Sequence, residues 1–243
     1  DHRDLHSFPT RRSSDLRFGR VAAPTAPGPD SYHKNRGLGQ FTHYGDQTMV
    51  LLRSLAAKKG FDLADFFGRW RTLFAHYDGD VDGATRNTLS RIDFGEGPET
   101  SGSSSQDLAG AARIAPLVFA LREDLPGLVD AARAQTRMTH NTPLVVDSAE
   151  FFARAAHAAL HGADPVAAMA KAAQARYLAL PARDWLAQGV EFAARDSVAA
   201  IAHFGQSCNV EGGFRAVVQL IARHAGNLRE GLIDDVMAGG YSA

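Results

Sequence analysis

Apolar residues recur at helical spacing from residue 48 onward, which predicts a series of amphipathic helices. One face of the first helix holds Met49, Leu52, Leu55 and Ala56. The second is expected to start after Asp62, a preferred capping residue, and its aromatic stripe consists of Phe66, Phe67, Trp70 and Phe74. We expect this stripe to lie in the core, because its spacing places the rings on one side of a helix.

The same pattern continues towards the end of the chain. Further helices are predicted over residues 81–92, 108–121 and 126–138, with Ala-rich helices as far as residue 238. Pro143 and Pro165 suit first helical turns, Asp164 suits a cap, and Gly162 suits a helix end. No stretch of alternating β-branched residues is bounded by turns. The sequence therefore predicts an all-α fold, a single compact multi-helix domain.

Two segments precede this helical region. Residues 1–16 read as the in-frame translation of a common sequencing-adapter oligonucleotide, so we exclude them from the fold as a library scar. Residues 17–40 are rich in Pro and Gly and predict a loop-rich lead-in. We expect the domain to span residues 41–243 and, since no Met opens the chain, to be a fragment truncated at both ends.

Composition narrows the function classes. The chain has 243 residues, of which 45% are hydrophobic, and its formal net charge is −1. A charge so close to zero gives no electrostatic footprint for nucleic acid or an anionic membrane. The apolar runs are too short to cross a bilayer. A single cysteine, Cys208, excludes an internal disulfide framework and favours a reducing cytoplasm.

Polar clusters interrupt the helices at a few places. They lie at residues 43–48, 101–113, 138–141 and 204–213, and one more closes the chain at 237–242. In all-α proteins, ligand sites form where helix ends and inward-facing polar groups converge. We therefore expect Asp46, His140 and the 208–213 loop to surround one common pocket.

In order, these clusters resemble the motifs of the ADP-ribosylglycohydrolase family. HYGDQTMVLL, from residue 43, is similar to the family's Thr-Asp-Asp-Thr element. AARIAPLV, from residue 111, resembles its Ala-Met-Arg-Val-Ala-Pro segment, and THN, from residue 139, its Thr-His element. CNVEGGF, from residue 208, followed by DDVMAGGYSA resembles the closing region with its Gly-Gly-Asp element. The resemblance extends over residues 41–243.

The resemblance implies an all-α hydrolase that cleaves the glycosidic bond between ADP-ribose and an acceptor, with two Mg²⁺ or Mn²⁺ ions. Hard cations of this kind require oxygen ligands from several carboxylates. Asp46 matches the first Asp of the motif and is the implied catalytic and metal-binding residue, while Gln47 replaces the second Asp as an oxygen ligand. Tyr241 and Ala243 stand where the closing element has Asp. We therefore expect the metal to be weakly bound.

Each candidate also has a plainer interpretation. Asp46 suits an N-cap, and His140, the implied substrate contact, suits a partly buried loop position. The predicted substrate contacts Ser104 and Ser105 belong to a stretch typical of a flexible linker. Cys208 is typical of a buried small hydrophobe rather than a nucleophile. Glu211 suits a solvated helix start rather than a pocket.

Two functions from different classes follow. The first is a hydrolase acting on an ADP-ribosylated protein or a small ADP-ribose conjugate. The second is a metal-poor relative that binds a nucleotide sugar or has a structural, crystallin-like role. Tyr241 separates the two, because an Asp at this position would supply a second metal-binding carboxylate.

Overall fold

The computed structural model describes residues 19–29 and 31–239. Predictions on residues 1–16 and on Tyr241 and Ala243 lie outside this part of the chain. The described part is all-α, as predicted, and contains isolated bridges but no strands. None of its helices combines the length and the apolar character that crossing a bilayer requires.

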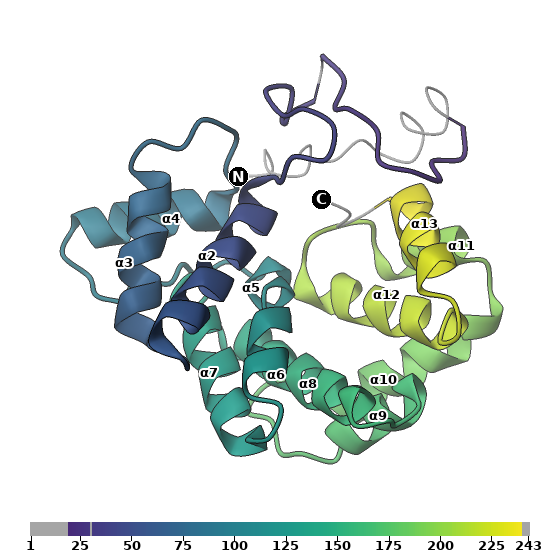
Figure 1. The fold of residues 1–243 in the computed structure, drawn as a ribbon. Coiled ribbons are helices and arrows are strands. Elements are labelled where there is room, and N and C mark those ends of the chain that lie inside the picture. Colours follow the sequence, from purple (N-terminus) through teal and green to yellow (C-terminus); the bar gives the residue numbers. More distant parts are fainter. Residues whose placement is uncertain (1–18, 30, 240–243) are drawn as a thin grey trace.

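The first half of the fold is built from α2 to α7 (Figure 1). The bounds of these helices are α2 His43–Lys58, α3 Leu63–Phe74, α4 Gly83–Asp93, α5 Ala109–Ala112, α6 Ala115–Ala120 and α7 Leu125–Arg137. Asp62 caps α3 by accepting a hydrogen bond from the Asp65 N–H, as predicted. The helix predicted over 108–121 is instead two short helices, because Pro116 has no N–H to donate to the Ala112 carbonyl.

The second half follows a long central helix, α8, at Pro143–Leu160. Its members are α9 Pro165–Ala172, α10 Ala182–Glu191, η2 Phe192–Ala194, α11 Ser197–Phe204, α12 Val210–Arg223 and α13 Leu228–Ala238. Pro143 and Pro165 occupy first turns, and the Asp164 carboxylate caps α9. Gly162 follows α8 with a φ of 90°, a conformation that glycine adopts without strain.

Helix α8 joins two hydrophobic clusters into one core. On one side lie the aromatic residues Phe66, Trp70 and Phe74 of α3, packed with α2, α6 and α7. On the other, Phe151 of α8 packs against Phe214 of α12, with ring centroids 4.7 Å apart. The predicted aromatic stripe is thus in the core, with Phe67 packed at its edge.

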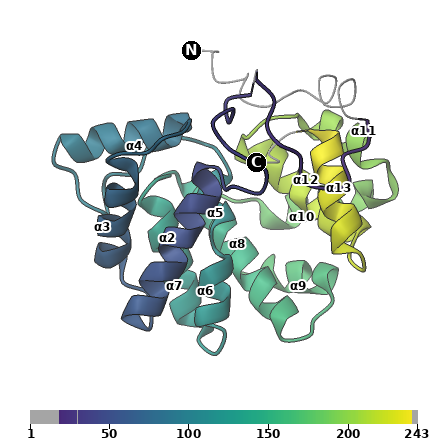
Figure 2. The same cartoon turned by 45° about the horizontal axis from the view of Figure 1, so that its top comes forward.

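The lead-in segment runs from the second half of the fold to the first. In Figures 1 and 2 it runs from beside α13 to the start of α2. The Val21 N–H lies 3.3 Å from Met237 Sδ, and Arg20 forms an ion pair with Glu230 of α13. The segment therefore connects two helices that are distant in sequence.

Candidate functional site

The start of α2 sets the position of Asp46. Thr42 is the N-cap, with extended backbone and no side-chain capping bond, and His43 is the first helical residue. Asp46 therefore lies within the first turn, and its interpretation as an N-cap is wrong. Its negative charge is still favoured there by the partial positive charge of the helix N-terminus.

The Asp46 carboxylate faces two side chains from other segments. Its Oδ2 accepts a hydrogen bond of 2.7 Å from the Tyr77 hydroxyl and lies 3.7 Å from Nη2 of Arg36. The Arg36 guanidinium also stacks 4.9 Å from the centre of the Tyr77 ring. Burial and the bond to Asp46 raise the pKa of Tyr77, so its hydroxyl is a permanent donor at neutral pH. Protein groups thus already balance the charge of Asp46.

Gln47, the next residue, points into the interior. Its Oε1 accepts hydrogen bonds of 2.7 Å from Trp70 Nε1 and 2.8 Å from Arg113 Nη1. A carbonyl oxygen has two lone pairs, and both are occupied here. A metal-ligand role for Gln47 would require its side chain to leave both buried donors. The structure does not bring Gln47 and Asp46 together as a ligand pair.

Arg113 connects three of the polar clusters. It lies in the break between α5 and α6, is buried, and donates to Gln47, to Gln135 Oε1 at 2.7 Å and to the Thr139 hydroxyl. The clusters at 43–48, 101–113 and 138–141 are therefore joined by one hydrogen-bonded chain. In the sequence, only the AARIAPLV motif points to Arg113, because hydrophobic periodicity does not identify a buried arginine.

His140 lies at the end of this chain. Its Nδ1 is 2.9 Å from Thr139 Oγ1. Because arginine can only donate, Thr139 accepts from Arg113 and can give its own hydrogen to Nδ1, which leaves the neutral ring protonated at Nε2. Among the described residues, Nε2 has no hydrogen-bond partner. Burial, helped by the charge of Arg113, lowers the pKa of His140 to about 4, so the ring is neutral at pH 7.

The serine-rich stretch is fixed beside His140. The Ser103 N–H donates to the Thr139 carbonyl at 3.0 Å, and the Asn141 N–H donates to the Ser103 carbonyl at 2.8 Å. The flexible-linker interpretation does not describe this backbone pairing. Ser104 is exposed next to it, and Ser105 is half-buried with its hydroxyl accepting from the Asp107 N–H. Ser104 and Ser105 therefore directly follow Ser103, the residue that forms an isolated β-bridge with His140.

The cluster at 204–213 joins the same region through its backbone. The Leu108 N–H donates to the Cys208 carbonyl at 2.9 Å, and the Val210 N–H donates to the Gln106 carbonyl at 2.8 Å. Burial and the neighbouring Asp107 raise the pKa of Cys208, so its sulfur stays a thiol. Cys208 is only half-buried, however, so it is not fully enclosed as the buried-hydrophobe interpretation expects. Glu211 is exposed in the first turn of α12, as its plainer interpretation predicts.

Sequence reasoning missed two acidic residues in this region. Asp107 is half-buried, and the resulting desolvation raises its pKa to about 7, an effect to which nearby Asp82 adds. Asp82 caps α4, and although burial opposes its ionisation, the His43 and Thr85 contacts keep its pKa below the ordinary value. A cap signal before residues 83–93 could have identified Asp82. Asp107 has no pattern of its own.

The described residues form no cluster of three or more His, Cys, Asp or Glu side chains suited to a metal ion. Two surface grooves have volumes of about 410 and 460 Å³, one at residues 173–184 and one between α2 and α3. Neither is lined by Asp46 or His140. A pocket shared by Asp46, His140 and the 208–213 loop therefore stays a prediction, although hydrogen bonds do bring their segments together.

The fold and its linked polar segments define an all-α protein with a candidate ligand site at helix ends. A sequence model of the ADP-ribosylglycohydrolase family matches residues 5–243, so the chain belongs to this family. Among solved structures, one described as an "ADP-ribosylglycohydrolase-related protein complex" is 23% identical, with a TM-score of 0.65. The match covers 100% of this chain and 75% of the other, and at this identity it shows the fold alone. A search of curated proteins finds no significant match.

Proposed function

We propose that this protein is a hydrolase that recognises ADP-ribose conjugates and cleaves the glycosidic bond between ADP-ribose and its acceptor. Membership of the ADP-ribosylglycohydrolase family supports the reaction class. The acceptor would be a side chain of an ADP-ribosylated protein or a small molecule. A cytoplasmic location, which the single cysteine favours, belongs to the same proposal.

The proposed recognition of ADP-ribose is supported by the buried Nε2 of His140. A buried donor without a partner costs about 1–3 kcal/mol, so such a group is commonly retained where a ligand satisfies it. A ribose hydroxyl or a diphosphate oxygen offers the acceptor that Nε2–H requires. Ser104 and Ser105, on the segment paired with His140, would supply further contacts to the same ligand.

Mg²⁺ or Mn²⁺ is the cofactor expected from the family, and the described residues do not fit it well. Two hard cations need several anionic oxygens to replace their hydration water. Asp46 is the matching carboxylate, and its Oδ2 already contacts Tyr77 and Arg36. We therefore propose weak metal binding and derive no catalytic step through the metal. Changing Tyr241→Asp, which would add the second family carboxylate, should strengthen it.

Binding without hydrolysis is the second candidate. The engagement of Asp46 by Tyr77 and Arg36, and of Gln47 by Trp70 and Arg113, favours it. In this alternative the chain would retain a nucleotide-sugar site, or the fold alone, and would lack turnover.

Calorimetric titration with ADP-ribose, combined with an ADP-ribose release assay in Mg²⁺ and Mn²⁺, tests both candidates. We expect His140→Gln to weaken ADP-ribose binding by at least about tenfold, the loss of one good hydrogen bond. The matched control is His76→Gln, because the His76 side chain is exposed. Binding with release supports the hydrolase, binding without release supports the second candidate, and equal affinity of both variants contradicts the role of His140.

A further inference from the structure

Residues 31–40, here called the strap, place the guanidinium of Arg36 beside the Asp46 carboxylate. The strap is a series of turns, in which the Arg36 N–H donates to the His33 carbonyl at 2.8 Å and the Gln40 N–H to the Gly37 carbonyl at 3.1 Å. These turns direct Arg36 towards Asp46, with Nη2 at 3.7 Å from Oδ2. The side chains of Arg36 and Asp46 are 20% and 27% exposed, so solvent screens the pair only in part.

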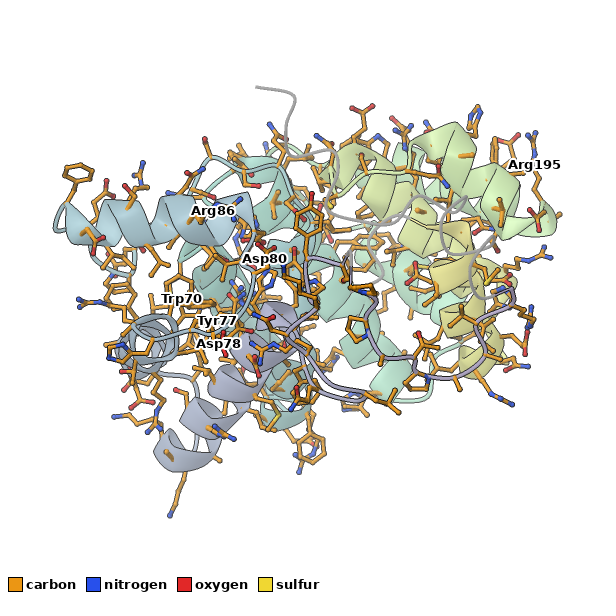
Figure 3. All side chains as sticks on the ribbon, turned by 90° about the horizontal axis from the view of Figure 1, so that it is seen from above. Trp70, Tyr77, Asp78, Asp80, Arg86 and Arg195 are labelled. Carbon is orange, nitrogen blue, oxygen red and sulfur yellow. The ribbon has the colours of Figure 1, made fainter. Side chains whose placement is uncertain are left out.

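The strap seats Arg36 against the loop between α3 and α4. The guanidinium lies over the ring of Tyr77, which ends a ladder of rings through Phe74 to Trp70, with the first and last rings labelled in Figure 3. A Cβ at Gly79 would come within 2.7 Å of Arg36 Nη2. Glycine at this position therefore leaves the space that the guanidinium fills.

A second residue of the strap, His33, also contacts α2. The His33 ring lies 6.1 Å from the ring of His43, on the first turn of α2, and His33 is partly buried. Arg36, Tyr77 and Asp46 thus form a seat with three components: an ion pair, a ring under the guanidinium, and a hydrogen bond to the same carboxylate oxygen. Such a seat is more specific than a solvated surface ion pair, whose contribution is small.

We propose that Arg36 is an internal cation that occupies the Asp46 carboxylate in place of a divalent metal ion. A divalent ion bound at Oδ2 and the guanidinium, whose Nη2 lies 3.7 Å from the same oxygen, repel each other strongly, because their charges have the same sign at a partly buried site. Metal binding at Asp46 therefore requires the strap to move away. Arg36 competes with the metal ion in the protein without substrate, independently of the proposed activity.

The test compares Mn²⁺ binding by the full chain with that of two charge-matched variants, using calorimetry in the absence of any ADP-ribose compound. Arg36→Gln is expected to bind Mn²⁺ at least about tenfold more tightly than the wild type. Arg20→Gln removes the same charge from the lead-in segment at its contact with Glu230 of α13, and is expected to match the wild type. Equal Mn²⁺ affinity of the three proteins would overturn the proposal.

A second measurement applies if Arg36→Gln does not fold, as judged by circular dichroism. In the wild type, millimolar Mn²⁺ should release the strap and accelerate tryptic cleavage after Arg36 several-fold, with cleavage after exposed Arg71 unchanged as the internal control. An unchanged rate after Arg36 would overturn the proposal. Because neither readout involves ADP-ribose, failure of the strap proposal is distinguishable from failure of the proposed function.

Discussion

Asp46 and Gln47 are adjacent on α2, yet their side chains lie in two different environments. Asp46 is partly buried and contacts Arg36 and Tyr77, whereas Gln47 is fully buried and contacts Trp70 and Arg113. A helix rotates by roughly 100° per residue, so neighbours face different directions. The comparison shows that a two-residue motif on a helix is divided by the fold into a solvent-facing half and a core half.

The core half should dominate stability, and Arg113 is its centre. Arg113→Ala is expected to lower the free energy of unfolding by at least about 3 kcal/mol, because it leaves a cavity and several buried acceptors without a donor. Relief from burying the guanidinium opposes this loss but is smaller than the sum of the lost contacts. Urea denaturation measures it, with exposed Arg122→Ala as the control. A loss below about 1 kcal/mol would mean that Arg113 is not the centre of the network.

The buried end of this network should also respond to acid. The folded-state pKa of His140 is about 4, below its ordinary value of 6.5, so between these values the unfolded chain binds a proton that the folded protein does not. Stability should therefore fall as the pH drops from 6.5 to 4, by about 3 kcal/mol in total.

His140→Gln lacks this titration. The difference in unfolding free energy between the variant and the wild type should therefore shift in favour of the variant by about 3 kcal/mol from pH 7 to pH 4. Asp107 titrates in both proteins, so its opposite contribution cancels from the difference. His76→Gln, changed at an exposed ring, serves as the control. A difference that does not vary with pH would contradict the burial of a neutral His140.

Gln47→Ala isolates the core half of the motif. The change removes the shared acceptor of Trp70 Nε1 and Arg113 Nη1, and we expect a loss of about 2 kcal/mol. Gln47→Glu, which keeps an acceptor and adds a charge beside Arg113, should lose less. Denaturation curves for both variants at pH 7 provide the comparison. Equal destabilisation by Gln47→Ala and Gln47→Glu would show that the acceptor oxygen of Gln47 does not stabilise the network.

The solvent-facing half should have the smallest effect. Asp46→Asn weakens the contact with Arg36 and keeps an oxygen for the Tyr77 hydroxyl, so we expect less than about 1 kcal/mol of lost stability. Thermal melts at low and high salt check this, since screening should shrink the difference. A loss as large as that of Gln47→Ala would remove the distinction between the two environments.

Local signals in the sequence predicted several helix ends correctly, although α2 begins at His43 and not near residue 48. Asp62 and Asp164 cap the helices assigned to them, Pro143 opens α8, and Gly162 follows it. These predictions succeeded because capping and chain reversal depend on a few neighbouring residues. The Pro116 interruption was also local, but the apolar period across residues 108–121 concealed it.

The sequence by itself determined the all-α class, the helix ends marked by a clear cap or turn residue, and the order of the polar clusters, because periodicity, caps and turn residues act within a few positions. Only the tertiary structure decided how the clusters are used. It paired Gln47 with Arg113 and Arg36 with Asp46. It also buried Nε2 of His140, for which no hydrogen-bond partner exists among the described residues. Such pairings join residues up to 66 positions apart, as between Gln47 and Arg113, and no local pattern encodes which distant donor meets which acceptor.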